Sequence, residues 1–124
     1  MTKFFATILA LFTLDASGHH AFPESFNTSQ SIEIRGQILA LAWMNPHVSF
    51  SVLADDGRVW QIETNSISRL ESDGIRQPRL APGTAVHIAG FPARNGEPSI
   101  HATHIEIGDD IEIVLRPGSK RRWR

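Results

Sequence analysis

The sequence contains no cysteine among its 124 residues. The protein therefore has no disulfide framework, no thiolate nucleophile and no zinc or iron–sulfur site held by cysteine, whatever its compartment. Any bound metal must use histidine, aspartate or glutamate. The length fits one small domain and leaves little room for a second.

A strong charge of either sign is also missing, because 12 basic residues face 13 acidic ones and the formal net charge is −1. Such a balance gives no general field that would gather nucleic acid, so we expect no nucleic-acid partner. The last nine residues, 116–124, form a basic tail that includes Trp123. Such a tail can dock on anionic lipid headgroups. We favour a solvated tail without membrane association.

The common signatures of catalysis are absent as well. The sequence has no Gly-x-Ser-x-Gly nucleophile elbow, no glycine-rich phosphate loop and no calcium-loop spacing of acidic residues. Its carboxylates gather in turns such as Asp55-Asp56 and Asp109-Asp110, and not as facing pairs. We therefore expect a protein that is not an enzyme.

Residues 1–18 have the pattern of a secretory signal peptide. Lys3 supplies a positive end, residues 4–14 are apolar, and Ala16-Ser17-Gly18 places small residues where a signal peptidase cleaves. The apolar run is too short for a stable bilayer anchor. A buried first strand or an uncleaved anchor is the alternative. We expect cleavage near Gly18 and a periplasmic or secreted protein.

From residue 32 onward, apolar and polar residues alternate with the period of β-strands. We expect strands over residues 32–43, 47–54, 58–64, 84–91 and 99–107, with an edge strand at 111–115. Hairpin signals stand at Asp56-Gly57 and Asn95-Gly96. A helix of about two turns is expected over residues 65–73, capped by Asn65 or Ser66.

Three strands, a short helix and two further strands follow the order of the OB-fold. We therefore predict an all-β protein with one short helix, folded as a small OB-like barrel of five or six strands over residues 19–115. A small β-sandwich is the alternative. Strand one is expected to bend near Gly36, and the mixed alternation of strand five indicates a bulge. The predicted core consists of Ile34, Ile38, Val48, Phe50, Ile62, Val86 and Ile88.

Several segments together resemble a family of small secreted bacterial proteins, the domain of unknown function family 6152. These segments are His19-His20-Ala21-Phe22 with Phe26, Trp43-Met44-Asn45-Pro46-His47-Val48, Asp56-Gly57 with Trp60 and Glu63, and Leu80-Ala81-Pro82-Gly83 with Val86 and Gly90. The resemblance extends to about Ile107. Ala21 and Asn27 depart from the family pattern, which has serine and aspartate there. The family has no assigned activity, so the resemblance implies none.

Cleavage after Gly18 would make His19 the new amino terminus. Its amine and imidazole would then form a chelate, and a further imidazole would complete a planar nitrogen set, an arrangement that suits copper(II). The candidates for that imidazole are His20, His47, His101 and His104. His47 ranks first because it follows a rigid Asn45-Pro46 turn at a strand start. We expect copper, or another transition metal, to be the ligand.

Simpler interpretations stand beside the metal site. The paired histidines would be a frayed terminus, and His47 would bond to the backbone of its own turn. His87 alternates with Val86 and Ile88 and is expected to face solvent. In a different class, the protein would be an adaptor that binds a protein or glycan in a barrel groove lined by Trp43 and Trp60. Packing of both tryptophans in the core or at the barrel rim is the alternative.

Overall fold

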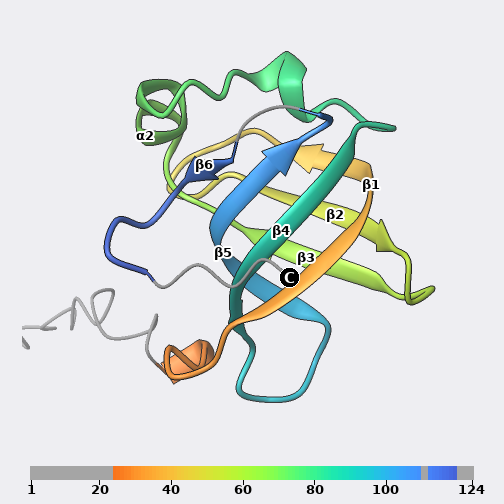
Figure 1. Ribbon diagram of the computed structural model, residues 1–124. Coiled ribbons are helices and arrows are strands. Elements are labelled where there is room, and N and C mark those ends of the chain that lie inside the picture. The colour runs from red at the N-terminus through yellow and green to blue at the C-terminus, as the bar shows by residue number, and fades with distance from the viewer. Residues whose placement is uncertain (1–23, 110–111, 120–124) are drawn as a thin grey trace, which may run out of the picture.

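The computed structural model describes residues 24–109 and 112–119, and the strands in it follow the expected order (Figure 1). The elements are β1 (Ile32–Ala42), β2 (Ser49–Ala54), β3 (Val59–Glu63), α2 (Ile67–Ser72), the 3₁₀-helix η2 (Gln77–Leu80), β4 (Ala85–Pro92), β5 (Ser99–Ile107) and β6 (Ile113–Val114). Each predicted strand is present, and the ends differ by at most a few residues. No helix within the described residues is long and apolar enough to cross a membrane.

The first five strands form a closed barrel. The sheet has the order β3-β2-β1-β4-β5-β6, and β3 also pairs with β5. The β3–β5 pairing is parallel and the others are antiparallel, so the barrel is mixed, with β6 outside it on the edge of β5. Closure leaves no open edge among the five strands. The barrel prediction is thus confirmed over the sandwich.

Strand β1 is long because it serves two neighbours. Its residues 32–37 pair with β4, and residues 36–42 pair with β2. A bulge lies between Ile38 and Ala40, slightly beyond the predicted bend at Gly36. Gly36 has a different role, since a Cβ there would lie 2.1 Å from the carbonyl oxygen of Leu53. The absence of a side chain lets β2 approach β1 closely.

The interior of the barrel holds one hydrophobic cluster. All seven predicted core residues belong to it: Ile34, Ile38, Val48, Phe50, Ile62, Val86 and Ile88. The predicted bulge in strand five is also present. Ala89 of β4 pairs with His104 and Gly90 with Ala102, so Thr103 is the extra residue on β5. This bulge explains why the alternation of β5 changes phase.

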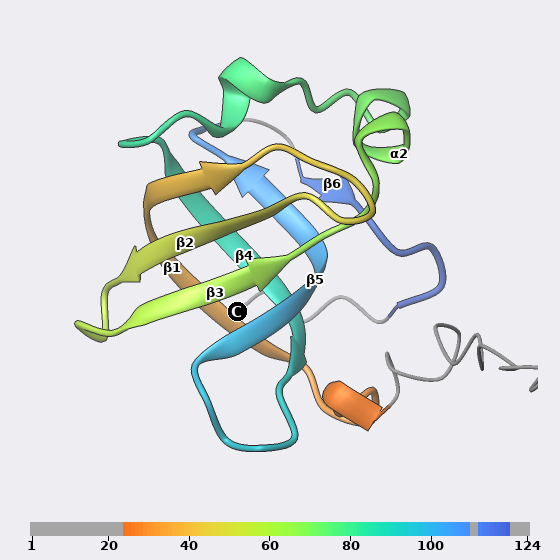
Figure 2. The same ribbon diagram turned by 180° about the vertical axis from the view of Figure 1, so that it is seen from behind.

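The two ends of the barrel are covered differently (Figures 1 and 2). Helix α2 and η2 cover one end, where the helix buries Leu70. Ser66 is the N-cap, and its hydroxyl oxygen accepts a hydrogen bond from the backbone N–H of Arg69. At the opposite end, the first described residues lie beside the loop that joins β4 and β5. That end of the chain leads to the candidate site.

Candidate functional site

The chain that follows His19 and His20 is fixed to the β4–β5 hairpin. The backbone N–H of Arg94 donates to the carbonyl of Ser25, and the N–H of Asn27 donates to the carbonyl of Pro92, both at 2.9 Å. Between these bonds Phe26 forms a β-bridge with Ala93. His19, His20 and the predicted signal peptide lie outside the described residues. The first described residues are therefore held against this hairpin.

Strand pairing brings two of the predicted ligands to one carboxylate. Glu63, at the end of β3, pairs with Ser49 on one side and with His101 on the other. His47 lies two residues before Ser49 and shares its outward side of β2, because side chains alternate along a strand. The three polar side chains therefore form a row on the outside of the barrel, where β3 and β5 close it.

The distances within this row are nearly equal. The Nδ1 atoms of His47 and His101 each lie 3.6 Å from Oε1 of Glu63. Side-chain exposure rises along the row, from 6% at His101 through 35% at Glu63 to 54% at His47. The Phe26 ring covers His101, with the ring centroids 5.6 Å apart. His101 is thus the buried end of the row, and His47 is open to solvent.

Glu63 remains ionised beside the two rings. Hydrogen bonding from the His101 ring is the main cause that holds the pKa of the Glu63 carboxyl below its usual value of 4.5. Partial burial opposes this effect, and charge attraction to His101 and His47 adds to it. The site therefore presents a negative charge between two imidazoles.

An open hollow of about 490 Å³ adjoins the carboxylate. It is lined by Glu24, Ser25, Phe26, Glu63, Ala93, Arg94, Asn95, Glu97 and Ser99. The hollow thus joins the start of the described chain, the β4–β5 hairpin and the central carboxylate of the row. Within residues 24–109 and 112–119, however, no group of three or more histidine, aspartate or glutamate side chains could hold a metal ion by itself.

His104 belongs to a different contact. Its Nδ1 lies 2.8 Å from the hydroxyl of Thr103, and its Nε2 lies 3.6 Å from Oε1 of Glu112. The ring is buried, and His104 pairs with Val114 of β6. These contacts connect the edge strand to the barrel.

The two tryptophans of the predicted groove lie apart. Trp60 is in the core, and its indole N–H donates to Asp56 at 3.1 Å. Trp43 is partly buried against the same core. Trp60 is opposite Val52, and Val52 is opposite Ile38. Ile38 precedes Trp43 by five residues, or roughly 16 Å along a strand. Among the described residues, the pair forms no common stacking surface.

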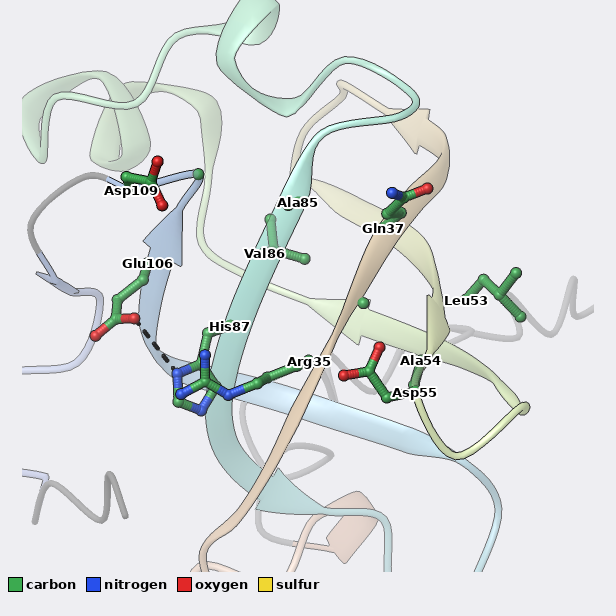
Figure 3. A pocket seen from close by; sticks show the side chains of 12 residues that line it. Arg35, Gln37, Leu53, Ala54, Asp55, Ala85, Val86, His87, Glu106 and Asp109 are labelled. Carbon is green, nitrogen blue, oxygen red and sulfur yellow. Dashed lines mark hydrogen bonds and ion pairs between the residues drawn. The ribbon is translucent and has the colours of Figure 1, made fainter.

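The expectation that His87 faces solvent is wrong. Its side chain is 5% exposed, with Nε2 3.5 Å from Glu33 and Nδ1 3.4 Å from Glu106. Figure 3 shows Glu106 reaching the ring while Arg35 extends toward it from β1, at a hollow of about 500 Å³. His87 does point away from the core, as alternation predicts, but neighbouring strands supply long side chains that cover it.

Glu63 and Phe26 were not among the residues predicted for the site. Alternation places Glu63 on the outer face, but only the parallel β3–β5 pairing puts it opposite His101. The OB order requires the third strand to pair with the fifth when the barrel closes, so the sequence could predict that these two strands are neighbours. The sequence could not predict the register that places Glu63 opposite His101.

Comparisons with known proteins give a family and a partial structural likeness. The crystal structure of a complex of TiaS with a transfer RNA and ATP is similar, with a TM-score of 0.48 and 21% sequence identity. The match covers 63% of this chain and 18% of that chain. No curated protein matches the sequence. The model of a family of unknown function, DUF6152, matches residues 8–101, and the protein therefore belongs to this family, as its motifs indicate.

Proposed function

We propose that this protein is exported, loses residues 1–18 and binds one copper(II) ion per chain through His19 and an imidazole of the barrel. One observation carries the proposal most directly. The hollow beside Glu63 is lined both by the first described residues and by the carboxylate at which His47 and His101 meet. The described chain thus starts at a hollow that Glu63 also lines, and Glu63 is 3.6 Å from each of the two predicted ligands.

The length of chain between the two parts is sufficient. His19 precedes Glu24 by five residues, and an extended chain of that length spans at most about 18 Å. Glu24 itself lines the hollow. The proposal therefore requires these five residues to cross the hollow from Glu24 toward the row, and His20 is next to His19 as a further donor.

The chemistry of these donors favours copper(II). An amine and imidazoles form a nitrogen set for which tetragonal copper(II) is the best match, and copper stands highest in the Irving–Williams order. His47 is the barrel ligand that we propose, because it is the exposed member of the row. His101 is the second candidate, since it lies against Phe26 on the chain that leads to His19. The bound ion would hold the amino-terminal segment on the barrel.

Isothermal titration calorimetry with copper(II) tests the proposal. The protein that starts at His19 is compared with a longer form that retains residues 10–18, in which the free amine is remote from both histidines. We expect the longer form to bind at least tenfold more weakly. His47→Ala in the mature protein should weaken binding further, and His87→Gln, at a histidine outside the hollow, should not.

Equal copper affinity of the two forms would show that the terminal amine is not a ligand. Equal affinity of His47→Ala and the unchanged mature protein would remove His47 from the site. Circular dichroism of each variant separates loss of binding from loss of fold. Amino-terminal sequencing of the exported protein gives the cleavage point, and a terminus other than His19 would overturn this mode of binding.

A binding module for a protein or glycan is the second candidate function. Leu53 and Val59 are exposed and directly paired on the outer side of β2 and β3, and Leu39 is exposed at the neighbouring bulge of β1. These residues favour this function more than the separated tryptophans do. A Leu53→Ser variant that lost a native partner while retaining its fold would support it.

A further inference from the structure

The row from His101 through Glu63 to His47 connects the buried wall of the barrel to an exposed imidazole. We infer that Glu63 is a positioning residue, which turns His47 so that its Nε2 is the atom offered to a metal. The inference rests on the proposed function and adds a residue that acts through the ligand.

The argument begins with the two nitrogens of an imidazole ring. A neutral ring carries one N–H, so a ring that donates from Nδ1 has its lone pair on Nε2. In His47 it is Nδ1 that faces the carboxylate, at 3.6 Å from Oε1 of Glu63. This distance is that of an ion pair and is slightly longer than a direct hydrogen bond. The negative carboxylate therefore favours, through its charge, the tautomer whose N–H is turned toward it. Histidines that bind metals commonly have their other ring nitrogen fixed by a carboxylate in this way.

The backbone around the pair holds its spacing. The N–H of Thr64 donates to the carbonyl of Val48 at 2.9 Å, and the Thr64 hydroxyl donates to the same carbonyl at 2.7 Å. The N–H of Val48 donates to the carbonyl of Asn65 at 2.9 Å. These bonds join the residue after His47 to the residues after Glu63, so the two side chains start from a fixed separation.

The other side of the carboxylate is fixed by His101. This residue is opposite Glu63 in the parallel pairing, is almost fully buried, and directs its own Nδ1 to the same oxygen. A carboxylate held from the buried side has less freedom to turn away when a metal approaches His47. Its orientation therefore exists before binding, which lowers the entropy lost on binding.

Two variants at position 63 separate positioning from direct ligation. Glu63→Ala removes the acceptor, and Glu63→Gln retains an oxygen acceptor of the same length without the charge. If Glu63 positions His47, Glu63→Ala should lower copper affinity by roughly 10- to 100-fold, and Glu63→Gln should recover most of the loss. If the carboxylate were itself a ligand, both variants would lose affinity to a similar degree, and the positioning role would be overturned.

A measurement without copper tests the same inference. The ¹⁵N chemical shifts of the histidine rings report which nitrogen carries the proton. In the metal-free protein we expect the Nδ1–H form at His47, a shift toward the Nε2–H form in Glu63→Ala, and the Nδ1–H form again in Glu63→Gln. Glu33→Ala is the matched control, because it removes a carboxylate that faces another histidine, His87, at 3.5 Å. It should leave His47 unchanged.

The outcomes distinguish this inference from the proposed function. A His47 tautomer that is the same with and without Glu63 overturns the positioning role, even if the protein binds copper. Absence of copper binding in the unchanged mature protein overturns the proposed function, whatever the tautomer shows. A tautomer change without an affinity change shows that the orientation of His47 does not matter to the metal, and this also overturns the inference.

Discussion

The indole N–H of Trp60 donates to Oδ2 of Asp56, four residues earlier in the chain, at 3.1 Å. The other carboxylate oxygen accepts from the backbone N–H of Arg58 at 2.8 Å, and the Arg58 guanidinium lies over the Trp60 ring. Asp56 thus organises the turn between β2 and β3 from a position that is open to solvent. The residue type follows from this role, since a carboxylate accepts at both oxygens.

The first prediction is that Asp56→Asn makes the protein less sensitive to acid. The backbone N–H of Arg58 is the main cause that lowers the pKa of Asp56 below its usual value of 3.8, and bonds from the side chains of Trp60 and Arg58 add to this. A carboxylate whose pKa is lower in the folded state stabilises the fold above its unfolded-state pKa. That contribution is lost as the pH falls through the folded-state value.

Urea unfolding at pH 7 and at pH 2.5 measures this effect. Between pH 7 and pH 2.5, the urea concentration at the unfolding midpoint should fall more in the unchanged protein than in Asp56→Asn. Asp55→Asn, at the neighbouring position, is the control. An equal loss in the unchanged protein and in Asp56→Asn would show that the ionised Asp56 does not stabilise the turn.

The second prediction concerns the centre of the barrel. Phe50 is buried within the core cluster, so Phe50→Ala should lower the free energy of unfolding by about 3–5 kcal/mol through lost burial and the cavity left behind. Leu53→Ala, on the exposed side of the same strand, should change it by no more than about 0.5 kcal/mol. Urea unfolding gives both values. A loss below about 1 kcal/mol at Phe50 would contradict its place in the core.

The third prediction connects packing with the site. A Cβ at Gly90 would lie 2.1 Å from the carbonyl oxygen of His101 and 2.7 Å from Cγ2 of Ile100. Gly90→Ala must therefore push β5 away from β4 at the residue that faces Glu63. We expect lower stability together with weaker copper binding.

Gly36→Ala is the matched substitution. It meets the Leu53 carbonyl oxygen at the same 2.1 Å, but between β1 and β2, at the other hollow. Thermal unfolding should show that both variants are destabilised, and calorimetry below their transitions should show that only Gly90→Ala binds copper more weakly. Unchanged copper affinity in Gly90→Ala would contradict the predicted dependence of the copper site on the packing of β5 against β4.

Much of the fold could be predicted because local patterns determine it. The alternation of apolar residues located the strands, including the bounds of Ser99–Ile107. The cap residues before an apolar turn predicted the start of the helix at Asn65 or Ser66, and Ser66 is the N-cap. The seven predicted core residues lie on the inward face of the barrel wall. Alternation alone is enough to identify which residues share that face.

Alternation does not specify which strands become neighbours. It also does not specify which side chains cover the outward face of a strand. His87 and His101 both point outward, yet Glu106 and Glu33 enclose one and Phe26 covers the other. The register of β3 against β5, which makes Glu63 the neighbour of His101, depends on barrel closure between segments far apart in the sequence. For the same reason, the sequence suggested His47 and His101 as separate candidates and not as one row.

The last prediction is that copper affinity rises with pH in a manner that depends on the amino terminus. Protons compete with the metal for the amine, whose usual pKa is about 7.7–8.0. In the mature protein, the apparent affinity should therefore rise close to tenfold per pH unit below about pH 7.7, because the bound amine must lose its proton. In the form that retains residues 10–18 the free amine is remote from the site, so this amine-dependent rise should be missing. Calorimetry in several buffers at pH 6.0, 7.0 and 8.0 also counts the protons released, because the observed heat varies with the ionisation enthalpy of the buffer.

The mature protein should release about one proton more per copper at pH 7.0 than the longer form does, since most of its amine is still protonated there. If the two forms release the same number of protons and follow the same pH profile, the amine takes no part in binding. His47 and its neighbours would then have to hold the ion without the terminus.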